Sequence, residues 1–207
     1  MYFNSNLIKE LSHIAQITYK MKGHLSLAFF CYFILLAVKP TSVFSQSNTL
    51  VEDNGKVLFM SEAPLELIKA KSDKLRGAIN KTQNTFAFAV DIHTFKGFNS
   101  DLQREHFHEN YMQTEKLPIA SFSGKFIEQV NFETNGTYVV RAKGMLSLHG
   151  VQKERIIKGV LVVNNGSIDI EAVFTVRLED HDIKVPKIVN EKIAEDIRVE
   201  ISIRFKK

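Results

Sequence analysis

Four long runs of this chain alternate large apolar side chains with small or polar ones, and this period of two constrains the fold more than any other feature. The runs cover residues 86–93, 138–149, 168–178 and 197–206. Successive side chains of a β-strand point to opposite faces, so each run has one apolar face and one face suited to water. Such alternation is typical of antiparallel sheets, because strands of parallel sheets are buried on both faces. The pattern therefore predicts an all-β domain.

Shorter apolar runs add further strands to this domain. With them the total is about eight to ten strands at hairpin spacing, which fits either a sandwich or a closed barrel. The strands that contain Phe86 and Tyr138 are predicted to be about twelve residues long, and long tilted strands favour the barrel. The added strands are predicted at 56–62, 65–71, 75–80, 121–132 and 156–164.

Turn and helix signals divide the strands. Asn135-Gly136 and Asn165-Gly166 each separate two runs. Asn-Gly is favoured in two-residue hairpin loops, where both residues need positive φ, so a hairpin is predicted at each pair. One short helical excursion is predicted from Asn99 to Met112, with Ser100 as its N-cap, and a weaker helical turn around 188–194.

The first 45 residues have the features of an export signal rather than of a folded domain. Met21-Lys22 gives a basic start, and Leu25–Val38 is an uncharged apolar run, too short to span a bilayer comfortably. We predict cleavage between Ser45 and Gln46, so that residues 1–45 are a leader and 46–207 a β-barrel domain. The protein is then expected to be exported, periplasmic or secreted, with no stable membrane span after cleavage. An uncleaved membrane anchor is the alternative.

Charge and cysteine content narrow the function classes. The chain has 27 basic and 23 acidic residues, but four of the lysines and only Glu10 lie in the predicted leader. The mature domain is then close to neutral and lacks the concentrated basic face that nucleic-acid binding requires. The single cysteine, Cys31, also falls in the leader, so neither a disulfide nor a thiol nucleophile is expected. A disulfide-free exported domain fits a periplasm.

The sequence contains no strong catalytic signature. It has no G-x-S-x-G elbow, no compact Ser/His/Asp order and no phosphate-binding glycine loop. Glu105, His106, His108 and Glu109 form an acid-rich patch, but residues two apart on a helix point in different directions and do not easily share a metal. We therefore expect no enzyme activity, no cofactor and no bound metal.

The inward faces of the strands mix small and large residues. Ala142, Gly144, Gly159 and Ala172 are small, whereas several inward phenylalanines are large and flat. An eight-stranded barrel is either just filled by its side chains or just able to hold one small ligand. Periodicity alone does not separate interlocked packing from an open tunnel.

Two segments carry a resemblance to a known family. Ser100–Gly124 contains a basic-acidic pair, a histidine, aromatic residues and a Lys-x-Pro element, and Gly144–Lys153 is a strand that ends in a Leu-x-x-x-Gly turn. In the order and spacing of these elements, the chain resembles the YceI-like family of lipocalin-like, polyisoprenoid-binding proteins. The resemblance implies an eight-stranded antiparallel lipocalin-like barrel with one helical excursion and an apolar tunnel for an isoprenoid or other fatty chain. The residues that match the family pattern are Arg104, His106, Pro118, Phe122, Leu146 and Gly150.

On this basis the favoured hypothesis is an exported protein that holds a chain-like apolar lipid, such as a polyisoprenoid, inside the barrel. The alternatives are a structural or protein-interaction barrel with a filled core and, less favoured, a metal-dependent enzyme. Strand edges of an imperfectly closed barrel could also pair two copies into a homodimer. The rim residues expected near a head group are His93, Arg104, His106 and His149. The interior residues expected to contact the ligand are Phe86, Phe88, Val90, Phe122, Phe126, Val140, Ala142, Gly144, Leu146, Phe174, Val176 and Ile201.

Overall fold

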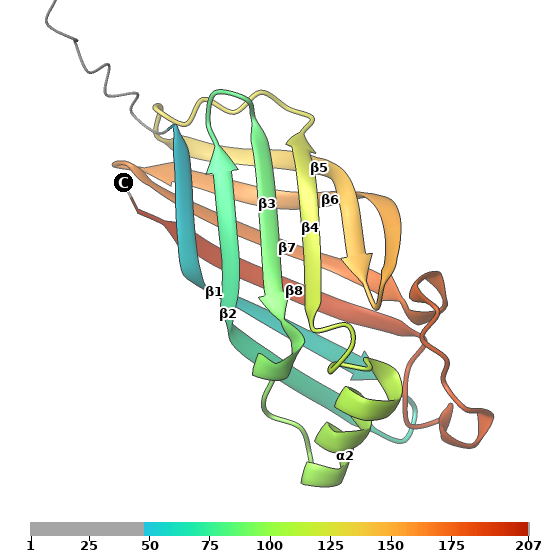
Figure 1. Ribbon diagram of the computed structural model, residues 1–207. Helices are drawn as coiled ribbons and strands as arrows, with labels where there is room; N and C mark the ends of the chain where they lie inside the picture. The colour runs from blue at the N-terminus through green and yellow to red at the C-terminus, as the bar shows by residue number, and fades with distance from the viewer. Residues whose placement is uncertain (1–47, 207) are drawn as a thin grey trace, which may run out of the picture. The chain divides into compact units, whose positions relative to one another are not determined.

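In the computed structural model, which describes residues 48–206, the alternating runs become the strands of one closed sheet (Figure 1). Each strand pairs antiparallel with the next one in the chain, and β8 pairs with β1 to close the barrel. The predicted all-β, eight-stranded antiparallel barrel is thus confirmed. Its strands are β1 (Thr49–Glu62), β2 (Leu67–Asn80), β3 (Thr85–Asp91), β4 (Ile119–Phe126), β5 (Gly136–Leu148), β6 (Val151–Asn164), β7 (Ser167–Arg177) and β8 (Asp196–Phe205).

The predicted leader lies outside the described residues. Its extent, the cleavage after Ser45 and export itself therefore stay predictions. Residues 48–206 form one compact unit with its own hydrophobic core. Within residues 48–206, no helix is both long enough and apolar enough to cross a membrane.

Only one of the two Asn-Gly hairpins is as predicted. Asn165-Gly166 forms the two-residue turn between β6 and β7, with φ of 48° and 86°. The hairpin predicted at Asn135-Gly136 is wrong, because residues 127–135 form a longer loop and Gly136 already begins β5. Another tight hairpin forms at His149-Gly150, between β5 and β6, with φ of 51° and 77°.

Several strand boundaries also differ from the prediction. β2 is continuous where two short strands were expected, and β3 is only seven residues long. β4 ends at Phe126 rather than near Phe132, because the side chain of Asn84 binds the chain there. Its Nδ2 donates to the carbonyl oxygens of Phe126 and Glu128, at 3.0 and 2.9 Å, and so occupies acceptors that a longer ladder would use.

The helical excursion is present at one end of the barrel, at the bottom of Figure 1. It consists of α2 (Asp101–His106), which continues into a π-helical turn, η2 (Phe107–Tyr111). Ser100 is the N-cap as predicted, since its Oγ accepts a hydrogen bond from the Gln103 N–H at 3.1 Å. Three 3₁₀ turns lie at the same end: η1 (Ile92–Thr94), η3 (Leu178–His181) and η4 (Lys187–Val189).

The two ends of the barrel are built differently. At the end that carries the β2–β3 turn and the β4–β5 loop, large side chains meet across the barrel axis, and Ile79, Leu161 and Phe205 are fully buried. We call this the filled end. The opposite end, which carries α2 and the 3₁₀ turns, is called the helical end (Figure 1).

Candidate ligand-binding cavity

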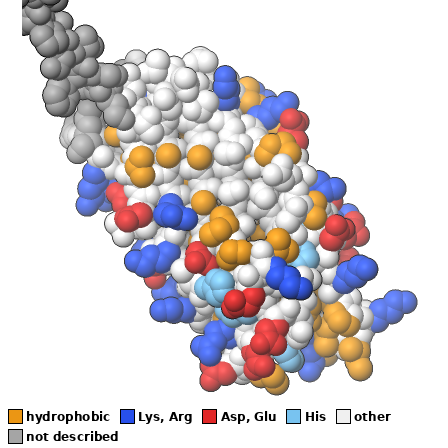
Figure 2. Space-filling model, in the orientation of Figure 1, with side chains coloured by type: hydrophobic (Ala, Val, Ile, Leu, Met, Phe, Trp, Pro, Cys, Tyr) orange, Lys and Arg blue, Asp and Glu red, His pale blue; other side chains and the backbone are white. Residues whose placement is uncertain are grey.

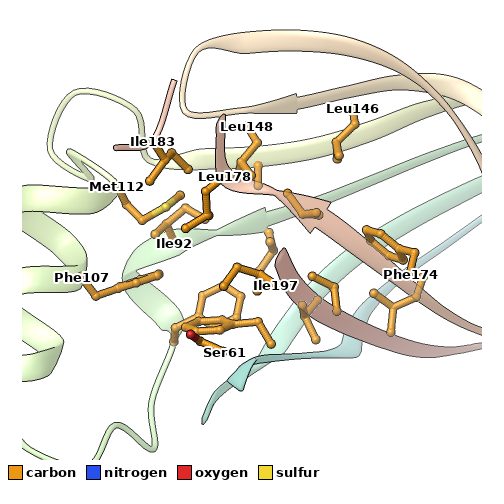
Figure 3. A pocket seen from close by; sticks show the side chains of 18 of the residues that line it. Ser61, Ile92, Phe107, Met112, Leu146, Leu148, Phe174, Leu178, Ile183 and Ile197 are labelled. Carbon is orange, nitrogen blue, oxygen red and sulfur yellow. The ribbon is translucent and has the colours of Figure 1, made fainter. Parts of the chain in front are cut away.

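A cavity of about 590 Å³ extends from the middle of the barrel to the helical end (Figure 3). All eight strands contribute to its wall, and most of the lining side chains are apolar. In Figure 3, Leu146, Phe174 and Ile197 line it from the strands, while Phe107 and Met112 close it from the helical excursion. The volume lies within the range of small-molecule sites, about 300–1,000 Å³.

A ring of paired residues forms the middle of the wall. Val57 pairs with Ile201, Ile201 with Ala172, Ala172 with Gly159, and Gly159 with Val140. All five line the cavity. The two smallest are neighbours across β6 and β7, and they leave room that larger side chains would fill.

Direct backbone pairing between β6 and β7 stops beside this ring. The β6–β7 ladder runs from the Asn164–Ser167 pair to the Gly159–Ala172 pair and stops there. Beyond it, towards the helical end, a side chain bridges the two strands: Arg155 Nη2 donates to the Thr175 carbonyl at 2.8 Å. A guanidinium side chain therefore takes the place of direct backbone pairing between β6 and β7 towards the helical end.

Four phenylalanines anchor the helical excursion over the open end. Phe59 of β1 packs on Phe95 and Phe107, with ring centroids 5.4 and 5.3 Å apart. Phe98 adds a contact with Phe107 at 5.0 Å. All four line the cavity, so the excursion supplies part of the cavity wall as well as its cover. Such aromatic pairs contribute about 0.5–1.5 kcal/mol each beyond their buried area.

The cavity opens between α2 and the loop that precedes β8. Of the residues that line it, only Ser100, Leu102 and His106 on α2 and Lys192 on that loop are exposed. We call this opening the mouth. Beside it, Glu66 is held by the excursion, since its Oε1 accepts hydrogen bonds from Gln103 Nε2 at 2.8 Å and from Asn99 Nδ2 at 3.2 Å.

The acid-rich histidine patch does not form a metal site in the described part of the chain. His106 lies at the mouth, whereas the Nδ1 of His108 is 3.1 Å from the Thr114 hydroxyl and its ring stacks on His93 at 6.0 Å. Burial lowers the pKa of His108. Among residues 48–206, no three His, Cys, Asp or Glu side chains come close enough to hold a metal ion.

Sequence comparison assigns this barrel to a family. A profile of the YceI-like domain matches residues 49–205, which is most of the chain. The chain belongs to the YceI-like family. Comparison with curated proteins gives no match.

Solved structures share the YceI-like fold at low sequence identity. A polyisoprenoid-binding domain from Saccharophagus degradans, implicated in plant cell wall breakdown, is 13% identical with a TM-score of 0.65, over 78% of this chain and 99% of that one. BcnA from Burkholderia cenocepacia is 11% identical with a TM-score of 0.60, over 72% and 95%. The YceI protein of Campylobacter jejuni is 13% identical with a TM-score of 0.53, over 68% and 85%. At these identities the comparison establishes the fold alone.

Ten of the twelve predicted interior residues lie on the wall of the YceI-like cavity. Their contact with a ligand stays a prediction. The other two lie elsewhere. Phe86 faces inward but lies towards the filled end, where it packs among Phe88, Phe122 and Phe126, at 5.7, 5.0 and 5.0 Å. Gly144 is directly opposite Gly124, and a Cβ built on it would lie 2.2 Å from the Ser123 carbonyl oxygen. Gly144 therefore permits close approach of β4 and β5 instead of making room for a ligand.

The four predicted rim residues are not brought together. Of them, only His106 lines the mouth. Arg104 is exposed and pairs with Asp101 at 3.1 Å. His93 is exposed, and hydrogen bonding to Asp91 raises its pKa. His149 sits in the β5–β6 hairpin, where its Nδ1 is 3.0 Å from the carbonyl oxygen of His181.

Sequence reasoning missed the part of the cavity that lies outside the strands. Phe95 and Phe98 flank Gly97 in a segment without period-two alternation, and Ile183, Val189 and Ile193 lie in a loop. One signal was available. Phe95, Phe98 and Phe107 place three aromatic residues close together in and around a short excursion, more than such a surface segment needs.

Proposed function

We propose that this protein holds one chain-like apolar lipid, such as a polyisoprenoid, in the cavity, with the chain along the barrel axis and the polar end at the mouth. The observation that carries this proposal is the apolar cavity of about 590 Å³ whose exposed lining residues, within 48–206, all lie at the helical end. Burial of an apolar chain contributes roughly 25 cal/mol per Å², so such a wall favours a long hydrocarbon over a polar ligand.

Two further observations support the proposal. The chain belongs to the YceI-like family, and a domain with the same fold is described as polyisoprenoid-binding. The filled-core alternative applies only to the filled end, because the other half of the interior is hollow. We also propose that the protein is exported to a periplasm or secreted after removal of residues 1–45, on the strength of the leader sequence.

Native mass spectrometry of the protein purified from its own cells, followed by organic extraction, tests the lipid-binding proposal. We expect a stoichiometric adduct that solvent releases and that is identified as a chain-like lipid. The matched variant is Ala142→Phe, which places a large side chain on the cavity wall and is expected to lose the adduct. A bare polypeptide mass, unchanged after incubation with isoprenoids and fatty acids, would contradict the proposal.

A further inference from the structure

Three separate segments meet around the mouth. The β1–β2 turn contacts the loop before β8, because the Leu65 N–H donates to the Glu191 carbonyl at 2.8 Å. The same turn contacts the start of α2 on its other side, since Asn99 Nδ2 donates to the Leu67 carbonyl at 3.1 Å. The tips of the turn, the helix and the loop therefore form one continuous surface at the helical end.

Each of these tips exposes a large apolar side chain. Ile188 on the loop is 92% exposed, Leu65 on the turn 67% and Leu102 on α2 59%. The exposed leucines of residues 48–206 are Leu65, Leu67 and Leu102, and all of them lie at this end. Single exposed apolar residues are ordinary on protein surfaces, but a group gathered from three segments around one opening is not.

Strand propensity does not explain this group. The exposed valines on the barrel wall, such as Val139 and Val173, occupy outward strand positions, where β-branched residues are favoured. Leu65, Leu102 and Ile188 lie in a turn, a helix and a 3₁₀ turn, where no such preference applies. Their apolar surface continues into the cavity, because Leu102 itself and Val189, next to Ile188, line it.

The charges next to Ile188 suit a lipid head-group layer. Residues 183–190 carry two exposed lysines, Lys184 and Lys187, and no acidic residue, and neither lysine forms an ion pair with a described residue. Further along the loop, Lys192 lies between the exposed Glu191 and Glu195. Figure 2 shows hydrophobic side chains together with lysine or arginine at the lower right, where Figure 1 places this loop. The α2 side carries charges of both signs, since Asp101 pairs with Arg104 and Glu105 is exposed beside them, so we expect apolar contact to dominate and anionic lipid to contribute less.

We propose that the surface around the mouth docks on a lipid bilayer. This surface is formed by Leu65, Leu102 and Ile188 with Lys184 and Lys187. The apolar tips enter the boundary between head groups and acyl chains, while the lysine side chains extend to the head groups. The mouth then faces the hydrocarbon, so an apolar cargo enters or leaves the cavity without crossing water. This last consequence rests on the proposed lipid-binding function; the docking itself does not.

Vesicle flotation of the domain 47–207 tests the docking surface. This part is expected to fold alone, because it is a compact unit with its own core. In addition, the structural match covers 99% of the Saccharophagus domain. The vesicles contain about three parts phosphatidylethanolamine to one part phosphatidylglycerol, an anionic bilayer of the kind that attracts basic segments. The test variant is Leu65→Glu with Ile188→Glu, neither of which lines the cavity. The matched control is Val51→Glu with Val139→Glu, which are 71% and 57% exposed on the barrel wall.

We expect the wild-type domain and the Val51/Val139 control to float with the vesicles, and the Leu65/Ile188 variant to bind at least about tenfold more weakly. Binding of a fluorescent isoprenoid, measured in parallel without vesicles, is expected to be equal in all three proteins. A wild-type domain that binds the isoprenoid but does not float would overturn the docking proposal and leave the lipid-binding function standing. Equal loss of flotation in test and control variants would also overturn it. Flotation with this pattern but without isoprenoid binding would support docking and contradict the proposed function.

Discussion

The filled end and the helical end of this barrel come from the same strands, yet one is solid and the other hollow. At the filled end, Gly77 leaves room for large neighbours: a Cβ there would lie 2.8 Å from both Ile203 and Phe205. In the middle of the barrel, where the cavity begins, Gly159 and Ala172 are small, but no large described side chain from the opposite wall fills the space, so they line the cavity. The comparison teaches that period-two alternation fixes which face is inward, whereas side-chain volume summed across the barrel decides whether the interior is filled.

The largest expected difference between the two ends is in the cost of truncating a phenylalanine. Phe205→Ala at the filled end removes a fully buried ring and should lower the free energy of unfolding by about 3–5 kcal/mol. Phe174→Ala at the helical end removes a ring that already borders the cavity and is only half-buried, so it should cost about 1 kcal/mol. Urea unfolding of both variants measures the difference. Equal losses would mean that the helical end is packed as tightly as the filled end.

The next largest effect is expected at the pair formed by Gly124 of β4 and Gly144 of β5. Gly144→Ala places a methyl group against the backbone of β4, which cannot move aside as a side chain could. We expect a loss of about 1–3 kcal/mol from strain, without any change in cavity volume. Thermal unfolding measures the loss, and Gly136→Ala is the control, because a Cβ there meets only the Tyr138 ring at 3.6 Å. A Gly144→Ala variant that is as stable as the wild type but binds lipid more weakly would instead mean that Gly144 contributes to the cavity wall.

The sequence predicted which strand residues face the interior because that depends on local alternation, but not which end of the barrel is filled. Val140 and Val176 could be placed inward from their own strands alone, and the structure puts both on the wall. Gly144 and Gly159 both belong to inward faces, and a Cβ on either would meet the backbone of the neighbouring strand, at 2.2 Å for Gly144 and 2.9 Å for Gly159. Only the register to β4 or β7 shows this, and only Gly159 also lines the cavity. That register depends on contacts between distant segments, which periodicity does not contain.

The remainder of the site could not be predicted because it is built from irregular segments. The Asn135-Gly136 error has the same origin: Asn-Gly predicts a hairpin locally, but Asn84, far earlier in the chain, ends β4 and lengthens the loop. Ile183 and Ile193 line the cavity only because the loop before β8 folds back over the open end. Nothing in their immediate sequence neighbourhood gives that path.

A smaller effect on stability, but a large one on binding, is expected when the hollow end is made to resemble the filled one. Ala142→Phe adds a ring to the cavity wall beside Ile157 and should reduce isoprenoid binding by about tenfold or more, because it removes volume that the chain would occupy. Stability should change by less than about 1 kcal/mol, since the ring enters empty space. Fluorescent isoprenoid titration measures the binding. Val139→Phe, which places the same ring on the outward face of the same strand, is the control and should bind as the wild type does.

The smallest expected effect is a dependence of folding stability on pH that arises at the helical end. His181 is fully buried in η3, and burial lowers its pKa, although its Nδ1 lies 3.3 Å from the Val151 carbonyl. The folded protein therefore keeps this ring neutral where the unfolded chain, with a pKa of about 6.5, takes up a proton. Its contribution to stability is fully present above pH about 6.5 and is lost as the pH falls towards its lowered pKa.

Urea unfolding between about pH 8 and pH 5 measures this loss, and His181→Gln should flatten it. His93→Gln is the control, because the hydrogen bond to Asp91 raises the pKa of His93 and gives it the opposite sign: its small contribution is present below pH about 6.5 and lost above its raised pKa. The control should therefore leave the loss on the acid side in place.

Protonation of His181 should also loosen the helical end before the filled end. Leu178 of η3 and Ile183, two residues after His181, both border the cavity. As the pH is lowered to about 5.5, the rate of backbone amide hydrogen exchange should rise first in η3 and the β5–β6 hairpin. An equal rise in β2 and β6, near Ile79 and Leu161, would show that the two ends respond as one unit.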